Sequence, residues 1–416
     1  MPSTRRLPTS VEARVFGAAA VLALAHALDD AFLLPGADVA VGRHALAAGI
    51  ALAATVAAVV CFERLRPGLR ALVAFTFGVL ATLNGGRHVH HFLHESLTAN
   101  DVTGALALGA GVVMLGLAAW IPFRHRGEGA SNPVVRLAIR VAIVPAFLLT
   151  AVFVYAPVGM GLVDEHILHR AVGSPPDASY ETVRFETSDG VDLEGWYRPS
   201  RNGASVLVIT GGGGNRRGTL RHAEMLVRHG YGVLVYDPRG AGESGGTPSS
   251  YAWGWEKDAD AALDYLATRE PGPIGALGLS SGADAAIDVA GRRDDVAAVV
   301  ADGAAAIGYK DIEGYTDDPL NRVTTWMMFK SIELMKGRSG PKVSLADQIA
   351  RSRSPHLIIS AGKTEKEWGE LYDRAGGERS TLWYLPKASH TAALRQYPAE
   401  YEHRVVGYLD EHLGVR

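Results

Sequence analysis

The first 163 residues are dominated by long apolar runs, whereas the rest of the chain alternates short β-branched runs with helical ones. A membrane span needs roughly 20 mostly apolar residues to cross a hydrocarbon layer of about 30 Å. Five N-terminal stretches have close to that length, at about 13–34, 45–62, 71–92, 102–122 and 141–163. A cleaved signal peptide would account only for the first of them. The pattern predicts an all-α bundle of five transmembrane helices over residues 1–163.

Basic residues alternate between the loops of this region, and this alternation predicts its orientation. They gather before or at the start of the first span, between the second and third, and between the fourth and fifth: Arg5, Arg6, Arg14; Arg64, Arg66, Arg70; Arg124, Arg126, Arg136, Arg140. The intervening loops hold little positive charge. With the N-terminus inside and five crossings, we expect a multi-pass protein of the cell membrane whose C-terminal domain lies outside the cytoplasm.

After a predicted linker at 164–180, the pattern changes to that of an α/β domain over residues 181–416. Segments 180–190 and 191–199 are predicted as antiparallel strands joined at Asp189-Gly190, a tight-turn dipeptide. Further strands are predicted at 204–211, 231–237, 273–280, 296–303, 356–362 and 381–388, and helices at 219–230, 255–269, 281–292 and 397–413. This alternation favours a mostly parallel, doubly wound sheet with helices on both faces.

Residues 303–354 interrupt the alternation. They include the bulky apolar side chains Trp326, Met327, Phe329 and Met335. In this architecture an insertion after the sixth strand lies above the strand ends, where ligands bind. We predict a small cap over the pocket, with an extra packed helix as the alternative.

Composition and charge narrow the chemistry. The formal net charge of −3 gives no indication of a nucleic-acid partner. The single cysteine, Cys61, excludes a disulfide framework within the chain and a cysteine-based zinc site. Histidines and aspartates gather at the outer end of the predicted bundle: His26, Asp29, Asp30, His88, His90, His91, His94, His166 and His169. They could hold zinc or copper or bond headgroups and water. Since no recognised ligand spacing is complete, we predict no metal and no cofactor.

The motif that carries chemistry is Gly278-Leu279-Ser280-Ser281-Gly282, which fits G-x-S-x-G. It follows an apolar strand and opens an Ala-rich helix, and this setting indicates a nucleophile elbow. Glycines are needed there because the sharp turn forces Ser280 into strained backbone angles and brings neighbouring chains close. A serine hydroxyl needs a base to take its proton. His390, just after the last predicted strand, is our choice of base.

The acid that orients this histidine is expected after the seventh strand, where Glu365 lies three residues past Gly362. We choose Glu365, with Glu367 as its close rival and Asp302, at the end of the sixth strand, as the third option. Each would otherwise be an ordinary solvated or capping carboxylate.

An oxyanion hole needs two backbone amides. One is assigned to Ser281, directly after the nucleophile. The other is assigned to Gly212, in the glycine run 211–214 after the first strand of the parallel sheet. A phosphate-binding loop is the competing interpretation of that run, but G-x-x-x-x-G-K-[ST] is absent.

Four motifs carry a resemblance to a known family: SDGVDLEGWY (188–197), TGGGGN (210–215), YDPRGAGESGG (236–246) and GLSSG (278–282). Residues 178–413 resemble the α/β-hydrolase superfamily, in particular its serine-aminopeptidase-like and esterase-like branch. The resemblance implies an α/β-hydrolase fold and hydrolysis of ester, thioester or amide bonds through an acyl-enzyme. Two positions depart from the family pattern: Thr210, where many members carry histidine, and the glutamate in place of the commoner aspartate.

Together these features predict a membrane-anchored serine hydrolase with Ser280, His390 and Glu365 as its triad. An acyltransferase using the same triad is the alternative. A non-catalytic sensory or binding module on a membrane bundle is a third hypothesis, against which the intact Ser/His/acid set argues. The predicted partners are the lipid bilayer and a small ester or lipid-like substrate, which the Trp/Met/Phe-rich insertion and the membrane anchor favour.

Overall fold

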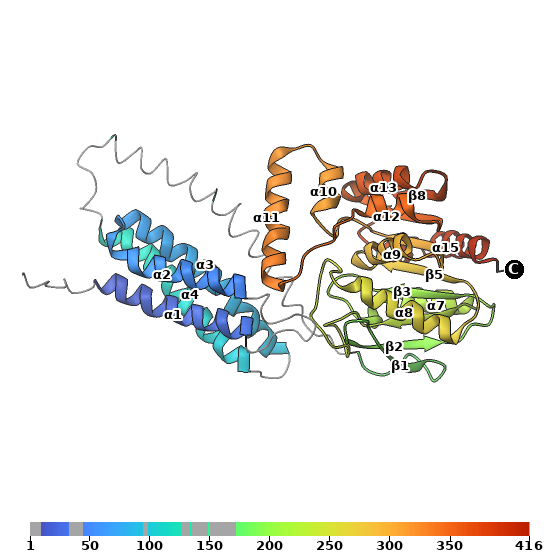
Figure 1. Ribbon diagram of the computed structural model, residues 1–416, viewed down its shortest axis with the longest axis horizontal. Helices are drawn as coiled ribbons and strands as arrows, with labels where there is room; N and C mark the ends of the chain where they lie inside the picture. Colours follow the sequence, from blue (N-terminus) through green and yellow to red (C-terminus); the bar gives the residue numbers. More distant parts are fainter. Residues whose placement is uncertain are drawn as a thin grey trace, which may run out of the picture. The chain divides into compact units, whose positions relative to one another are not determined.

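A computed structural model describes residues 10–32, 45–94, 99–125 and 172–415, together with positions 134 and 149. The chain divides into two compact units. Of the described residues, four N-terminal helices belong to the first unit, and the sheet with the helices around it belongs to the second (Figure 1). One later helix, α11 (Pro319–Lys336), is divided between the two units.

The N-terminal helices are α1 (Val11–Phe32), α2 (Ala45–Cys61), α3 (Pro67–His94) and α4 (Ala99–Arg124). They coincide with the first four predicted spans, and the fifth, at 141–163, falls outside the described residues apart from position 149. Within the described residues, three stretches are long and apolar enough to cross a membrane: Val11–Asp29, Pro67–Gly86 and Val102–Arg124. Since α2 has only 17 residues, the five-helix bundle stays a prediction.

Polar side chains connect the helices of this unit near both ends of α1. Glu12 of α1 lies 3.1 Å from the Arg70 guanidinium of α3. Near the other end, His26 Nδ1 lies 3.0 Å from Thr103 Oγ1 of α4, and that hydroxyl donates to Asp29 Oδ2 at 2.6 Å. Because burying a polar group without a partner is costly, these pairs constrain how α1 packs against α3 and α4.

The second unit is built on one sheet of eight strands. They are β1 (Glu181–Glu186), β2 (Asp192–Arg198), β3 (Ser205–Ile209), β4 (Gly232–Tyr236), β5 (Ile274–Leu279), β6 (Val296–Asp302), β7 (His356–Ala361) and β8 (Ser380–Leu385), in the order β1-β2-β4-β3-β5-β6-β7-β8. β1 and β2 are antiparallel to each other, and β2 is antiparallel to β4. The remaining pairings are parallel, which confirms the predicted mostly parallel sheet.

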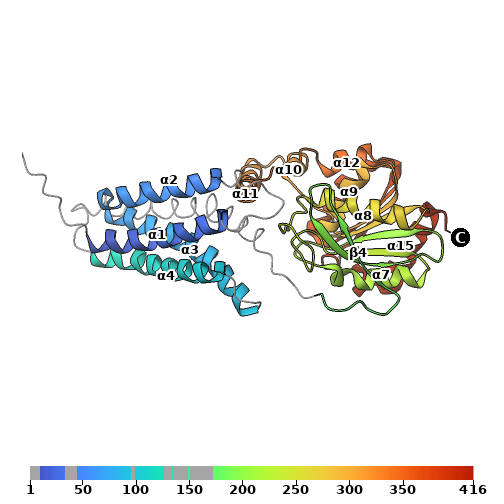
Figure 2. The ribbon, with the colours of Figure 1, turned by 60° about the horizontal axis from the view of Figure 1, so that its bottom comes forward.

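Helices cover both faces of the sheet, as predicted (Figure 2). On one face lie α7 (Leu220–Arg228) and α15 (Pro398–Leu413), whose apolar side chains form a core with β3 to β8. On the other lie α8 (Trp255–Arg269), α9 (Ser281–Arg292) and α13 (Gly362–Gly376). The central strands are buried on both faces, which explains their nearly uninterrupted Val, Ile, Leu and Ala content.

No helix is predicted at the position of α13. Its sequence is rich in Lys and Glu, contains an internal glycine at Gly369, and presents only a narrow apolar stripe. Trp368 and Tyr372 form that stripe at helical spacing, and both are buried. Packing of these two rings against the rest of the domain therefore stabilises this helix.

The insertion at 303–354 forms α10 (Tyr309–Tyr315), α11 and α12 (Leu345–Arg351). α12 packs against α9 and α13. The ring of Tyr315 in α10 stacks on Trp368 of α13 with centroids 3.9 Å apart. These two short helices thus extend the helical layer of the domain, and a cap formed by α11 stays a prediction.

A buried ion pair ties the loop after β4 to α8. Arg239 Nη2 lies 2.7 Å from Asp258 Oδ1, and both side chains are fully buried. Arg239 also contacts Asp189 in the turn between β1 and β2, at 3.0 Å. Three segments that are distant in sequence therefore meet at one guanidinium group.

We expect Asp258→Asn to lower the free energy of unfolding by about 3–5 kcal/mol, because it leaves the buried Arg239 without its main counter-charge. Burial raises the pKa of Asp258 to about 6, so thermal unfolding is compared at pH 8, where the carboxylate is ionised. The matched control is Asp264→Asn, which removes an exposed partner of Arg293 and should cost less than about 1 kcal/mol. Equal shifts in the two variants would contradict this account.

Candidate active site

Ser280 lies between β5 and α9 in a conformation that few residues other than glycine adopt. Its φ is 53° and its ψ is −123°, and such strain costs on the order of 1–3 kcal/mol. The amide of Ser280 donates to the Asp302 carbonyl at 2.8 Å. A Cβ atom at Gly278 would lie 2.0 Å from the Gly282 carbonyl oxygen, and one at Gly282 would lie 2.3 Å from that of Ile209. Both glycines of the motif are therefore required by close backbone approach, as predicted.

A chain of hydrogen bonds runs from Ser280 to a carboxylate. Nε2 of His390, in the loop after β8, lies 2.9 Å from Ser280 Oγ. Its Nδ1 lies 2.7 Å from Glu365 Oε1. The other oxygen of Glu365 accepts from the amide of Ala361 at 2.8 Å. Because this carboxylate lies in the first turn of α13 and is buried, its two contacts fix it against the imidazole.

The two other candidate acids do not form this contact among the described residues. Glu367, also in the first turns of α13, accepts instead from the Tyr315 hydroxyl at 2.8 Å. Asp302 is fully buried at the end of β6, and burial raises its pKa to about 7. The structure brings His390 together with Glu365, the first choice from sequence.

The loop after β3 approaches Ser280 through its glycines. A Cβ atom at Gly211 would lie 3.2 Å from that of Ser280, and one at Gly212 would lie 2.5 Å from the Ser250 carbonyl oxygen. The same carbonyl accepts from the hydroxyl of Ser281. In the described part of the chain the amides of Gly212 and Ser281 donate to no other group. Both amides assigned to the oxyanion hole thus lack an internal acceptor among the described residues, and their role stays a prediction.

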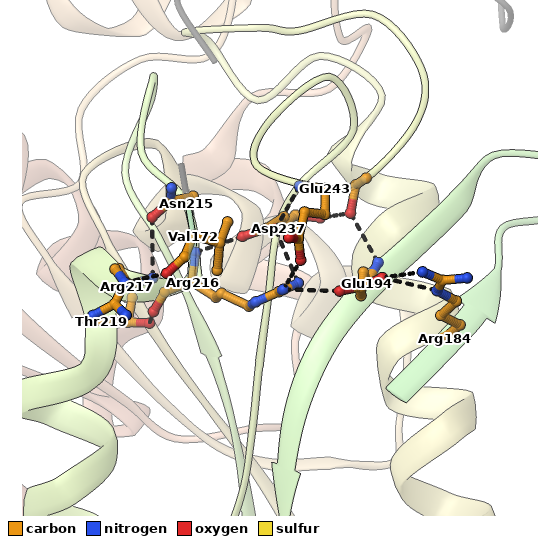
Figure 3. A network of polar contacts seen from close by, with 10 residues as sticks. Val172, Arg184, Glu194, Asn215, Arg216, Arg217, Thr219, Asp237 and Glu243 are labelled. Atoms are coloured by element: carbon orange, nitrogen blue, oxygen red, sulfur yellow. Dashed lines mark hydrogen bonds and ion pairs between the residues drawn. The ribbon is translucent and has the colours of Figure 1, made fainter. Parts of the chain in front are cut away.

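Figure 3 shows the polar network that anchors this loop. Arg216, directly after the glycine run and its asparagine, is buried, and its backbone amide donates to Asp237 Oδ1 at 2.7 Å. Its guanidinium lies 2.9 Å from Glu194 of β2 and 3.0 Å from Asp237 after β4, and it also pairs with Glu243. The guanidinium carbon lies 4.8 Å from the centroid of the Trp196 ring. Residues from two of the four sequence motifs therefore meet around Arg216, which directly follows a third.

Another buried acid near the site was not singled out from sequence. Asp284, in the first turn of α9, accepts from the Ala305 amide at 2.9 Å. Burial raises its pKa to about 8, so the side chain is protonated at neutral pH. Its position four residues after Ser280 was the available signal, but an aspartate in a first helical turn is ordinarily solvated.

A pocket of about 340 Å³ opens beside His390. Its walls come from the start of α7, the end of β5 and the segment from His390 to α14 (Ala393–Gln396), and its lining residues are Gly218, Arg221, His222, Leu279, His390, Thr391, Ala392, Leu394 and Arg395. No sequence motif next to Arg221 or Arg395 would have identified them as pocket residues.

For the N-terminal histidines the structure brings His26 and Asp29 to a shared Thr103. In the described parts of the chain no group of three or more His, Cys, Asp or Glu side chains is placed to hold a metal ion. The side chains of His88, His90, His91 and His94, and residues His166 and His169, fall outside those parts.

Comparison with known proteins shows the family to which the chain belongs. The family described as serine aminopeptidase, S33, matches residues 200–355. The uncharacterized protein Rv2307c of Mycobacterium tuberculosis is 31% identical over 196 residues, which is 44% of this chain and 68% of that one. The chain belongs to the α/β-hydrolase superfamily. The resemblance of residues 178–413 to this superfamily is thereby confirmed, as is the prediction of an α/β-hydrolase enzyme.

Two further proteins are similar to this hydrolase over its C-terminal part. Thiohydrolase apmlB of Arthrinium phaeospermum is 34% identical over 128 residues, covering 29% of this chain and 42% of that one. The esterase Pf2001 of Pyrococcus furiosus, a solved structure, has a TM-score of 0.48 and 24% identity, and the match covers 59% of this chain and 97% of that one.

We expect the pKa of His390 in this α/β-hydrolase to lie above the ordinary value of about 6.5, chiefly because its imidazole is hydrogen-bonded to Glu365. Glu365→Gln removes the charge that stabilises the imidazolium, so the pKa of His390 should fall. The titration is followed by NMR on the imidazole resonance of His390, which is assigned by its absence in the His390→Asn variant. Glu367→Gln is the control and should leave the titration unchanged; an equal fall there would contradict the assignment.

Proposed function

We propose that this protein is a membrane-anchored serine hydrolase that cleaves carboxylic esters and thioesters through an acyl-enzyme on Ser280. The observation that carries the proposal is the hydrogen-bond chain from Ser280 through His390 to Glu365, at 2.9 and 2.7 Å. A relative named a thiohydrolase favours thioesters among the substrates. The family description names an aminopeptidase, so amides are also candidate substrates.

In the proposed cycle, Ser280 Oγ attacks the substrate carbonyl while His390 Nε2 takes the hydroxyl proton. The carboxylate of Glu365 stabilises the imidazolium that forms. The amides of Gly212 and Ser281 donate to the oxyanion, and losing one such donor costs about 2.7–4 kcal/mol of activation free energy. His390 then protonates the leaving group. A water molecule, deprotonated by the same histidine, releases the acid and regenerates Ser280.

Hydrolysis is favoured over acyl transfer by the exposure of the base. The side chain of His390 is 52% exposed, so water has ready access to the imidazole that would activate it. An acyltransferase needs to exclude water from its acyl-enzyme, because water competes with the acceptor. Product analysis with an added alcohol tests this choice: formation of a new ester in place of the acid would favour transfer.

A fluorophosphonate probe should label the full-length protein in detergent, and Ser280→Ala should abolish the labelling. The same substitution should lower kcat for p-nitrophenyl esters by about 10⁴-fold or more, as for other nucleophile deletions. Ser281→Ala is the matched control, because it keeps the backbone amide and should still be labelled. Absence of Ser280-dependent labelling would contradict both enzymatic hypotheses.

The proposed membrane anchor is supported by the outer surface of the N-terminal helices. Large apolar side chains are exposed there, among them Val21, Leu22, Ile50, Val56, Val60, Val112 and Phe123. A soluble bundle turns such residues inward and covers its outer face with charge. Outward-facing apolar side chains suit a hydrocarbon environment instead. We infer a multi-pass arrangement with the hydrolase domain outside the cytoplasm.

A reporter enzyme that is active only outside the cytoplasm should be active when fused after residue 164. The same reporter fused after Arg66, between α2 and α3, should be inactive, since basic loops are retained inside. Expression of both fusions is compared by immunoblot. Cytoplasmic behaviour of the fusion after residue 164 would overturn the proposed orientation.

A further inference from the structure

The pocket beside His390 carries an unbalanced positive charge. Arg221, in the first turn of α7, and Arg395, in α14, both line it and are exposed. Their side chains form no ion pair or hydrogen bond with another group in the described parts of the chain. By contrast, Arg216 and Arg228 on either side of Arg221 in sequence pair with Glu194 and Glu402. The guanidinium groups of the two pocket arginines are therefore available to a ligand in the pocket.

No other lining residue offsets this charge. The lining contains no aspartate or glutamate. The third basic wall residue, His222, is buried, and burial together with the charge of Arg221 lowers its pKa to about 4. It is therefore neutral at pH 7 and contributes a ring, packed edge-on 5.5 Å from that of Tyr401. The pocket thus holds two fixed positive charges and, when His390 is protonated, a third.

The position of the pocket decides which half of a substrate reaches it. His390, which is itself part of the wall, hands its proton to the leaving group in the proposed mechanism. Gly212 and Ser281, which bind the oxyanion there, are not part of the wall. Leu279, directly before Ser280, is also part of the wall. A leaving group that takes its proton from His390 is therefore next to the pocket lined by Arg221 and Arg395.

We propose that this pocket binds an anionic group, a carboxylate or a phosphate, on the leaving-group half of the substrate. The guanidinium fork matches both groups, because each offers two oxygen atoms to parallel N–H donors. This inference rests on the proposed function, since it assigns a substrate class to the same site. The preferred substrate is an ester or thioester of an acidic alcohol or thiol component.

Two phenyl acetates that differ only in the charge of the leaving group test the inference. Hydrolysis of the anionic 4-acetoxybenzoate and of the neutral 4-acetoxybenzamide is measured with the full-length enzyme in detergent. Each kcat/KM is divided by the rate of alkaline hydrolysis of the same ester. We expect a preference of about tenfold for the anion, as for a hydrogen bond to a charged group. Arg221→Gln and Arg395→Gln should each lower that preference several-fold, mainly through KM, and 0.5 M NaCl should weaken it.

Arg374→Gln is the matched control, since Arg374 is an exposed arginine of α13 that does not line the pocket. It should leave the ratio of the two substrates unchanged. A ratio near one in the wild type, or a preference that survives both pocket substitutions, would overturn the inference while leaving the proposed hydrolase intact.

Binding without turnover separates the two proposals. Calorimetry with Ser280→Ala protein measures the affinity for 4-hydroxybenzoate, with 4-hydroxybenzamide as the neutral reference. Preferential binding of the anion that is lost in Arg221→Gln and Arg395→Gln, but kept in Arg374→Gln, supports the pocket even if neither ester is cleaved. If the anion binds preferentially but neither ester is cleaved, the proposed function is wrong and the anion-binding pocket still stands. Equal affinity for the two ligands overturns the pocket.

Discussion

The buried guanidinium of Arg216 connects the loops around Ser280, because an arginine removed from water needs counter-charges. Glu194 comes from β2, while Asp237 and Glu243 come from the loop after β4. The glycine run that reaches Ser280 directly precedes this arginine. Moving that loop would separate the guanidinium from its partners, so the network stabilises the position of Gly212 as well as the fold.

The strained turn at Ser280 depends on the same rigidity. A positive φ at a serine persists only where the surroundings over-determine it. Here β5 fixes one side, α9 fixes the other, and the amide of Ser280 is held by the carbonyl of Asp302 on β6. Gly278 and Gly282 let these segments touch. The hydroxyl is consequently presented at the end of the sheet, where the loops after β3 and β8 can reach it.

Charge is distributed asymmetrically around His390. On the Nδ1 side, Glu365 is held by the Ala361 amide and favours the protonated imidazole. On the pocket side, Arg221 and Arg395 line the same wall as His390. The carboxylate side and the arginine side of this imidazole therefore carry opposite charges.

Local patterns in the sequence were sufficient to predict the strands of the sheet, the nucleophile elbow and the glycines around it. Period-two and apolar runs, turn dipeptides and close-packed glycines act between residues that are near one another in the chain. Local sequence patterns could not decide between Glu365 and Glu367. Both lie on α13, and residues two apart point about 200° away from each other around a helix, so only the packing of α13 against β7 and β8 decides which carboxylate meets His390.

The same limit applies to the pocket. Arg221 and Arg395 belong to segments that are distant in sequence, and neither is marked by a neighbouring motif. They come together because β3 and β5 are adjacent in the sheet while the loop after β8 folds back over their ends. The sequence by itself determined the strands of the sheet, the motif around Ser280 and the family of this protein. The tertiary structure decided which carboxylate contacts His390 and which charged side chains line the pocket beside it, because side chains from distant segments meet only after the sheet has formed.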